Sequence, residues 1–214
     1  MVIVHEKRQI TQNNSYRVLK RLLDIIVAFI LLILLFPIIV LIGILIFTFE
    51  RGPVLFLQQR TGQFNKEFTI IKFRTMERSV INNVHEYVWD GQVPQNFVFR
   101  TPDNLTVTKL GAILRKYSLD ELPQLINVIK GEMSFVGPRP EILNITKFYD
   151  GVQKKRLMVK PGITGFAQVN GRSDINHGLK INFDLYYVDH ISLFLDFKII
   201  CKTIVLVLTG KGAY

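Results

Sequence analysis

The feature that most constrains this chain is an apolar run over residues 25–47, in which every residue is apolar, glycine or proline. The run continues to Phe49 with only Thr48 between. It is longer than the roughly 20 residues that a helix needs to cross a bilayer, and a secretory signal peptide would have a shorter apolar core. The sequence therefore predicts a membrane segment over residues 22–50, preceded by a basic arm or helix over residues 1–21.

Pro37 lies in the middle of this segment and leaves two arrangements open. A proline removes one helical hydrogen bond and clashes with the preceding turn, so a break would leave two halves of about 12 residues, or roughly 18 Å each. Neither half would cross a hydrocarbon core of about 30 Å. A helix–break–helix hairpin that re-enters one leaflet fits this length. A proline-kinked single span is the alternative, since spanning helices tolerate such kinks.

Positive charge on both flanks favours the re-entrant arrangement, because the positive-inside rule then puts both flanks on the cytoplasmic side. The basic residues are Lys7, Arg8, Arg17, Lys20 and Arg21 before the segment, and Arg51, Arg60, Lys66, Lys72 and Arg74 after it.

Composition narrows the class of partner. The 214 residues suggest one domain or two small ones, and 27 Lys and Arg against 17 Asp and Glu give a net charge of +10, which points to an anionic partner. A hydrophobic fraction of 49% favours acidic lipid or a phosphorylated ligand over nucleic acid, for which no recognition motif is present. The lone Cys201 excludes an internal disulfide framework, and the four histidines lack zinc-ligand spacing.

Two strands are predicted over residues 54–60 and 68–74, joined by a turn at residues 61–63. Lys72 and Arg74 stand two residues apart, so both side chains would leave one strand face and present two cations to an anionic ligand. A solvated strand face explains the pair equally well. Residues 77–107 have weak periodicity, with a short helix predicted over residues 80–89 and no readable function.

The centre of the chain places two adjacent carboxylates at a predicted helix start. After a short helix over residues 109–115, Ser118 is expected to act as N-cap and Glu121 to complete a capping box, with Gly131 as the stop. Acids in a first turn are favoured by about 0.3–1 kcal/mol each, so Asp120 and Glu121 have a structural explanation. As consecutive helical residues they would point about 100° apart and divide two roles.

Cations and glycines follow this centre. Pro138 and Pro140 stiffen Arg139, which suits bidentate phosphate binding, although a rigid connector is the alternative. A helix is predicted over residues 141–148 and a turn-forming glycine loop over residues 161–165. Residues 191–214 predict an amphipathic helix at a membrane interface rather than a buried core helix. A further cationic patch comprises Lys154, Lys155, Arg156 and Lys160.

Four motifs in this order resemble the bacterial sugar transferase family, the monotopic phosphoglycosyl transferases. They are Lys72-Phe-Arg-Thr-Met76, Leu114-Arg-Lys-Tyr-Ser-Leu-Asp-Glu-Leu-Pro-Gln124, Met133-Ser-Phe-Val-Gly-Pro-Arg-Pro140 and Pro161-Gly-Ile-Thr-Gly165. The resemblance covers residues 17–208 and the compact catalytic form of the family. It implies an α/β, mostly helical, membrane-associated monotopic fold with a small β-hairpin, the re-entrant segment, interfacial helices and a cytoplasmic catalytic domain over residues 51–190.

The resemblance also implies a reaction. Members transfer a phosphosugar from a nucleotide sugar, usually a UDP-sugar, to polyprenyl phosphate such as undecaprenyl phosphate, with release of UMP and a requirement for Mg²⁺. Asp120 would be the nucleophile that forms an aspartyl-phosphosugar intermediate, and would also contact the metal, with Glu121 as its partner. Arg115 and Arg139 would bind phosphate, with Lys72 and Arg74 near the site. The product would start a bacterial exopolysaccharide, capsule, O-antigen or glycoprotein glycan.

The expected location is the cytoplasmic face of the bacterial inner membrane, with nucleic acid excluded as a partner and a homodimer left open. Two departures from the family pattern are Phe36 before Pro37, where serine is common, and Phe166, where tryptophan is common. The alternative is a non-catalytic membrane-surface binding module with a degenerate site. The intact Asp120 and Glu121 argue against this alternative.

Overall fold

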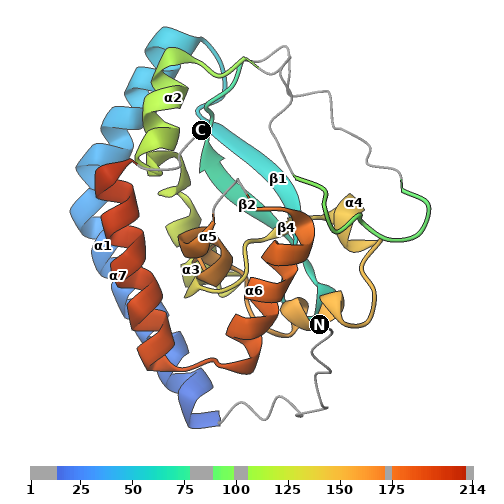
Figure 1. Cartoon of the computed structure of the whole chain (residues 1–214). Helices are drawn as coiled ribbons and strands as arrows, with labels where there is room; N and C mark the ends of the chain where they lie inside the picture. The colour runs from blue at the N-terminus through green and yellow to red at the C-terminus, as the bar shows by residue number, and fades with distance from the viewer. Residues whose placement is uncertain (1–13, 78–88, 99–105, 172–174, 211–214) are drawn as a thin grey trace.

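The computed structural model describes residues 14–77, 89–98, 106–171 and 175–210. The basic arm predicted before residue 14 and nearly all of the helix predicted over residues 80–89 lie outside these ranges. The element order is that of an α/β chain in which helices surround small sheets (Figure 1).

Helix α1 (Asn14–Glu50) is one continuous α-helix of 37 residues with Pro37 inside it. The predicted break into two helices is therefore wrong, and residues 14–21 are the first turns of the same helix rather than a separate arm. A buried stripe of Asp24, Ala28, Ile42 and Ile46 lies on both sides of Pro37 and packs against the rest of the chain. This packing stabilises one helix although the proline removes a backbone donor.

The rest of α1 is exposed and apolar. Phe29, Leu34, Phe36 and Phe47 are 59–70% exposed, and only 11% of the most apolar 18-residue window is buried. By length and composition α1 is able to cross a membrane, with a mean hydropathy of 3.6 in that window. Exposed apolar side chains gathered along one helix in this way are typical of a surface that contacts a membrane or another protein.

The predicted β-hairpin is confirmed. Strand β1 (Leu55–Thr61) pairs antiparallel with β2 (Glu67–Phe73), Leu55 standing opposite Phe73, and the short 3-10 helix η1 (Gln63–Asn65) lies in the turn. Strand β4 (Glu141–Ile142) adds to the other edge of β1. It occupies the start of the helix predicted over residues 141–148, which is reduced to α4 (Leu143–Thr146).

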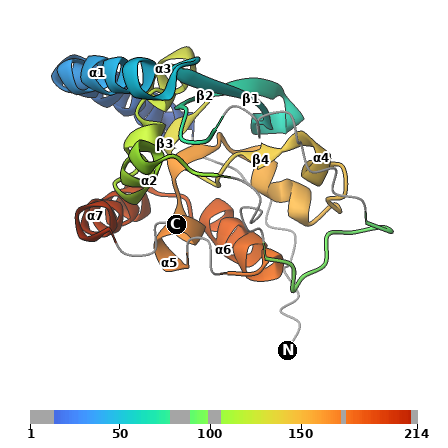
Figure 2. The same cartoon turned by 90° about the horizontal axis from the view of Figure 1, so that it is seen from above.

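A second sheet and the remaining helices complete the domain. Strand β3 (Ser134–Val136) pairs parallel with β5 (Gly162–Thr164), at the glycine loop predicted as a turn. Helix α3 (Gln124–Lys130) packs against α1, and together with Phe68 and Ile70 of β2 it encloses a core around Ala28 (Figure 2). The other elements are α2 (Lys109–Lys116), η4 (Gln153–Met158), α5 (Phe166–Asn170), α6 (His177–Asp189) and α7 (Leu193–Thr209).

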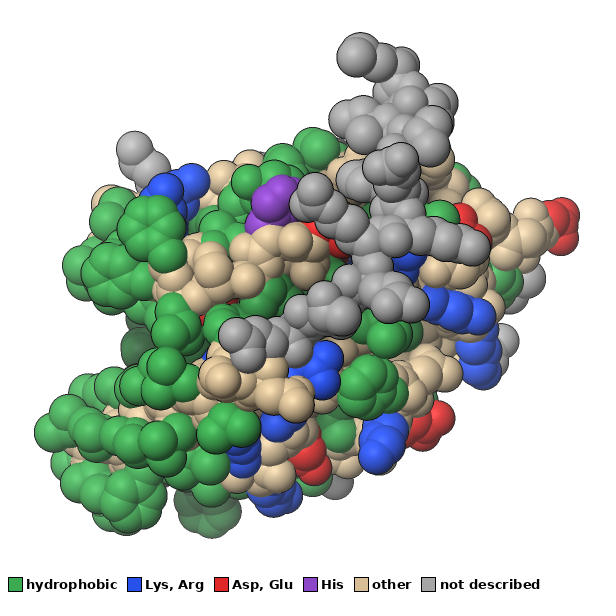
Figure 3. Space-filling view, turned by 90° about the horizontal axis from the view of Figure 1, so that it is seen from below, with side chains coloured by type: hydrophobic (Ala, Val, Ile, Leu, Met, Phe, Trp, Pro, Cys, Tyr) green, Lys and Arg blue, Asp and Glu red, His purple; other side chains and the backbone are tan. Residues whose placement is uncertain are grey.

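Helix α7 confirms that the predicted tail segment is helical. Asp196 and Ile199 are its buried residues, whereas Lys198 and Lys202 are exposed. Buried Asp196 accepts hydrogen bonds from Tyr16 (3.0 Å) and Lys20 (2.6 Å) of α1. Phe194 and Phe197 on its opposite side are 67% and 63% exposed. Helices α1 and α7 lie on the same side of the molecule, where apolar side chains gather in two groups (Figure 3). Ile199 of α7 is 1% exposed and belongs to a core cluster with Val136 and Val159, so α7 meets the domain through both an acid and an apolar side chain.

Candidate active site

The acid pair lies on a short 3-10 helix, η3 (Leu119–Glu121), between α2 and α3. The predicted capping box is wrong: Ser118 is in the left-handed conformation (φ 54°) and its side chain caps nothing, while α3 begins only at Gln124. The Glu121 carboxylate instead forms ion pairs with Lys72 and Arg139. Gly131 ends α3 as predicted, at φ 86°. Successive residues of a 3-10 helix are about 120° apart, so the two acids still diverge.

Glu121 is held by two cations. Its Oε1 accepts hydrogen bonds from Lys72 Nζ at 2.8 Å and from Arg139 at 2.9 Å. Burial alone would raise the pKa of Glu121, but attraction by Arg139 and Lys72 outweighs burial and lowers this pKa to about 2. Glu121 is therefore ionised throughout the physiological range and acts as a fixed anion that positions two cations.

Asp120 is the less constrained member of the pair. Its side chain is buried, with 9% of the residue exposed, and no donor among the described residues bonds to its carboxylate. Burial, and then repulsion by Glu121, raise the pKa of Asp120 against the attraction of Lys72, Arg139 and Arg115. A desolvated carboxylate with free oxygens, close to cations, has the environment expected of a nucleophile or a ligand of a metal.

The other two predicted cations differ in placement. Arg115 donates from Nε to Thr75 at 2.9 Å, and its charge acts on Asp120. Arg74 instead donates to the backbone oxygen of Glu50, the last residue of α1, at 3.0 Å. Side chains alternate between the two faces only within a strand, and β2 ends at Phe73. Arg74 lies beyond this end, so it does not share a face with Lys72. The structure brings Lys72, Arg115 and Arg139 around the acids, and it uses Arg74 to hold α1.

Asn127 positions Lys72 and has no counterpart in the sequence reasoning. Its buried amide accepts a hydrogen bond from the backbone of Ile71 (3.1 Å) and donates to that of Thr69 (2.8 Å), so that α3 is joined directly to β2. A polar residue among the apolar residues 125–129 is the one signal that could have indicated this role, because a buried amide requires partners.

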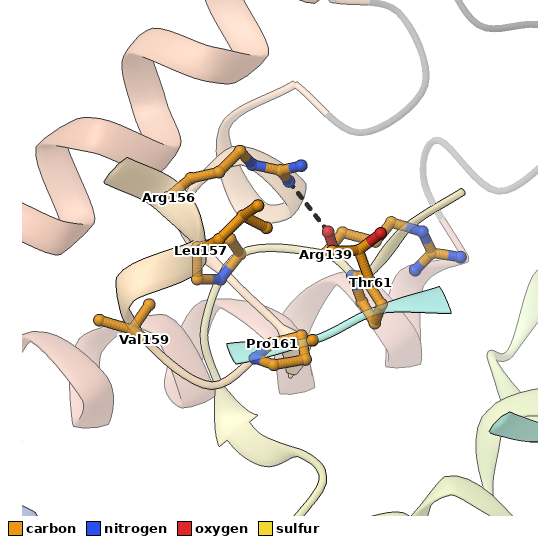
Figure 4. A pocket seen from close by; sticks show the side chains of 9 residues that line it. Thr61, Arg139, Arg156, Leu157, Val159 and Pro161 are labelled. Carbon is orange, nitrogen blue, oxygen red and sulfur yellow. Dashed lines mark hydrogen bonds between the residues drawn. The ribbon is translucent and has the colours of Figure 1, made fainter. Parts of the chain in front are cut away.

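Arg156 positions Arg139 in a similar way. It belongs to the predicted cationic patch, but it is 1% exposed, and its guanidinium donates to the backbone oxygen of Arg139 at 2.9 Å (Figure 4). It also donates to Asp184 at 2.9 Å and to Glu141 at 3.3 Å. Figure 4 shows the Arg139 side chain extending away from Arg156, so a buried ionic cluster fixes the backbone while the guanidinium remains available.

Removing Arg156 should destabilise the protein strongly. We expect Arg156→Met to lower the free energy of unfolding by about 3–5 kcal/mol, because buried Asp184 would lose its ion pair with Arg156 and buried Glu141 would lose one of the cations paired with it, keeping Lys180. Urea denaturation followed by circular dichroism measures this change. Lys154→Met is the matched control, since Lys154 lies exposed in the same segment. Equal stability of the two variants would contradict the structural role assigned to Arg156.

A magnesium ion is compatible with the acid pair. Within the described residues no group of three or more His, Cys, Asp and Glu forms a metal cage. Mg²⁺ commonly binds to one or two carboxylates together with substrate phosphates and water, and Asp120 offers free, hard oxygen ligands of this kind. If Mg²⁺ binds here, Asp120 is its protein ligand.

Comparison with known proteins identifies the class that this site belongs to. The sequence profile of the bacterial sugar transferase family matches residues 15–210. The uncharacterised sugar transferase EpsL of Bacillus subtilis is 43% identical over 91% of this chain and 90% of its own length. The exopolysaccharide production protein ExoY of Rhizobium meliloti is 37% identical over 91% of this chain and 88% of its own length.

Longer relatives have more specific names. The UDP-glucose:undecaprenyl-phosphate glucose-1-phosphate transferase of Klebsiella pneumoniae is 40% identical over 94% of this chain, which spans 43% of that protein. The chain thus spans nearly all of the compact relatives and less than half of this longer one. It belongs to the bacterial sugar transferase family. The expected family and the expected enzyme class, a phosphoglycosyl transferase, are confirmed by these comparisons.

Proposed function

We propose that this enzyme transfers a phosphosugar from a UDP-sugar to undecaprenyl phosphate or a similar polyprenyl phosphate, and releases UMP. The observation that carries the proposal is the division between the two acids: Glu121 is bound by Lys72 and Arg139, whereas Asp120 is buried beside them with free oxygens. Relatives named as undecaprenyl-phosphate sugar phosphotransferases support the same chemistry.

The transfer takes place in two displacements. A carboxylate oxygen of Asp120 attacks the β-phosphorus of the UDP-sugar, and the bond from this phosphorus to the bridging oxygen breaks, so that UMP leaves with that oxygen. An oxygen of the lipid phosphate then attacks the same phosphorus. The bond to Asp120 breaks, which restores the carboxylate and yields a lipid diphosphate sugar. Carboxylates serve as covalent nucleophiles of this kind in other phosphoryl transfers.

The cations stabilise the charge that develops. Arg139 and Arg115 bind phosphate oxygens, and Lys72 neutralises the same region while held by Glu121. When bound, Mg²⁺ supplies further neutralisation of the diphosphate. Arg139 is suited to this role because its side chain is 46% exposed although one nitrogen is bound to Glu121.

The test is a product assay. Purified protein in detergent is incubated with a panel of UDP-sugars, polyprenyl phosphate and Mg²⁺, and the nucleotide product is identified. Continuous UMP release with both substrates, together with a burst of one equivalent from the UDP-sugar alone, supports the proposal. UMP release that strictly requires both substrates would support the transfer but contradict the two displacements. Release of UDP would make the enzyme an ordinary glycosyltransferase, and no release with any sugar would favour the non-catalytic membrane-binding module.

We further propose that the chain enters only one leaflet of the cytoplasmic membrane. Both ends of α1 contact one protein body: Lys20 binds Asp196 of α7, and Glu50 binds Arg74 beyond β2. The two ends are about 45 Å apart at 1.5 Å per residue. A span perpendicular to a hydrocarbon core of about 30 Å would draw this polar body into lipid. A shallow, monotopic position along the exposed faces of α1 and α7 avoids this cost.

Labelling tests this topology. Cysteine is placed at Ser15 or Lys66, both exposed and on either side of the apolar run, in a Cys201→Ser background. We expect a membrane-impermeant maleimide to label neither position in intact spheroplasts and both in inside-out vesicles. Labelling of one position from each side would establish a single span and exclude the monotopic position.

A further inference from the structure

A second group of cations surrounds a cavity of about 190 Å³ at the N-terminal end of α1. The cationic side chains that line it are Arg17, Lys20 and Arg21 of α1 and Lys160, which precedes β5. Asp24 is the one carboxylate among its described lining residues. The lining therefore has a net positive charge, which favours an anionic ligand.

The cavity is separate from the acid pair. Leu119 of η3 packs against a cluster that contains Ile42 and Ile46, with Ile39 beside it, whereas the cavity is lined by α1 only as far as Asp24. Of the α1 residues near Leu119, Ile39 is the nearest to Asp24. It lies about 22 Å from Asp24 along the axis of α1, at 1.5 Å per residue. Asp120 and Glu121 do not line the cavity.

Ser134 supplies an independent sign of a ligand. Ser134 is 1% exposed, and its backbone N–H donates a hydrogen bond to the backbone oxygen of Pro161 at 2.9 Å. Its side-chain hydroxyl has no hydrogen-bond partner within the described part of the chain. Ser134 and Val136 stand two apart on β3 and both line the cavity, so both side chains point into it. A buried hydroxyl without a partner is unfavourable, and a bound acceptor would satisfy it.

The cations of the cavity differ in what they already bind. Lys20 pairs with Asp196, and Arg21 donates to the backbone oxygens of Val128 and Ile129 at the end of α3. Lys160 has no hydrogen bond or ion pair with any residue that the structure describes. Burial, and then repulsion by Arg21, lower the pKa of Lys160. The Lys160 ammonium and the Ser134 hydroxyl are thus two donors that a single anion would satisfy.

The size and position of the cavity define the anion. Pockets for drug-sized ligands are about 300–1,000 Å³, so this cavity suits a small group with several acceptor oxygens rather than a nucleotide sugar. Exposed apolar side chains lie close in sequence to its lining residues: Leu19 and Leu23 lie beside Lys20 and Asp24 on α1, and Phe194 of α7 lies three residues after Ile191. We propose that the cavity binds a phosphate group, and that a membrane phospholipid carries this phosphate with its chains along the apolar faces of α1 and α7.

Vesicle binding tests the proposal with the full-length protein. Flotation is measured with vesicles of phosphatidylcholine alone and with one-fifth phosphatidylglycerol. We expect wild type to bind the anionic vesicles more tightly, and Lys160→Gln or Ser134→Ala to reduce this gain about tenfold, since each removes one donor to a charged group. Lys154→Gln is the matched control, because it removes an exposed charge from the same segment. Binding to phosphatidylcholine alone should be unchanged in all variants.

Three results would overturn the proposal or its lipid source. Equal losses for Lys160→Gln and Lys154→Gln would mean that the gain comes from general surface charge. If Ser134→Ala kept the full preference for anionic vesicles, the Ser134 hydroxyl would not be a ligand of the anion. The third result concerns the source of the phosphate. Inorganic phosphate could raise the melting temperature of wild type but not of Lys160→Gln, while phosphatidylglycerol does not improve vesicle binding by wild type. This combination would assign the cavity to free phosphate. UMP release is measured separately, so failure of the proposed reaction is distinguishable from failure of this site.

Discussion

Replacing Asp120 with asparagine should lower turnover by about 10³-fold or more while making the protein more stable at neutral pH. Asparagine preserves the size of the side chain but removes the nucleophilic carboxylate. The folded protein raises the pKa of Asp120, so ionisation of this group opposes folding above that raised pKa. The asparagine variant lacks this cost at pH 7, and its advantage should vanish below the unfolded-state pKa, near pH 3.8, where Asp120 is protonated.

Two measurements accompany the turnover assay. Intact-mass spectrometry of wild type with a UDP-sugar alone should reveal a phosphosugar adduct that Asp120→Asn does not form. At pH 7 the melting temperature of Asp120→Asn should be higher than that of wild type. The melting temperature of the exposed control Asp90→Asn should equal that of wild type. If Asp120→Asn retained a tenth of wild-type turnover, the covalent mechanism would have to be abandoned.

Replacing Glu121 with glutamine should have the opposite effect on stability. The pKa of Glu121 falls from 4.5 to about 2 in the folded protein, so the ionised group contributes roughly 3 kcal/mol of stability above pH 4.5. This contribution declines as the pH falls toward 2. Glu121→Gln should therefore be less stable than wild type at pH 7, and the difference should disappear near pH 2. Denaturant titrations at several pH values measure it, with exposed Glu67→Gln as control.

The same substitution should alter catalysis in a characteristic way. Without the Glu121 charge, repulsion of Asp120 ends and Lys72 and Arg139 act on Asp120 alone, so its pKa should fall. We expect turnover to fall about 10²–10³-fold, because the cations lose their fixed positions, and the acid limb of the pH–rate profile to move to lower pH. An acid limb that stays in place would show that Glu121 does not set the protonation of Asp120.

Local patterns predicted the elements that local interactions form. The alternation in residues 54–74 defined the hairpin, and helical spacing defined α2 and the tail helix α7. The motif resemblance singled out Asp120, Glu121, Arg115, Arg139 and Lys72, which the structure places together. Their catalytic roles remain predictions.

Interactions between distant residues account for the errors. Pro37 suggested a break because its own backbone disfavours a helix, but the buried stripe on both sides of it packs on elements far along the sequence. Glu121 fitted a capping box by its spacing, yet its partner Lys72 is 49 residues away. Asn127 bonds to β2 across 56 residues and Arg156 to Asp184 across 28, so no short window of sequence contains either role.

The buried stripe of α1 has a consequence for how this enzyme meets its lipid. Ala28 packs with Phe68 of β2, the strand that carries Lys72, and Ile46 packs with Phe73 of the same strand and with Leu114 beside Arg115. The long apolar helix α1 is thus packed into the catalytic domain as one of its sides rather than attached to it by a linker. A chain cut before residue 51 would lose core contacts of β2 and α2 along with the apolar face of α1. In the proposed monotopic position, the depth at which α1 lies in the bilayer would set the distance of the acid pair from the lipid surface.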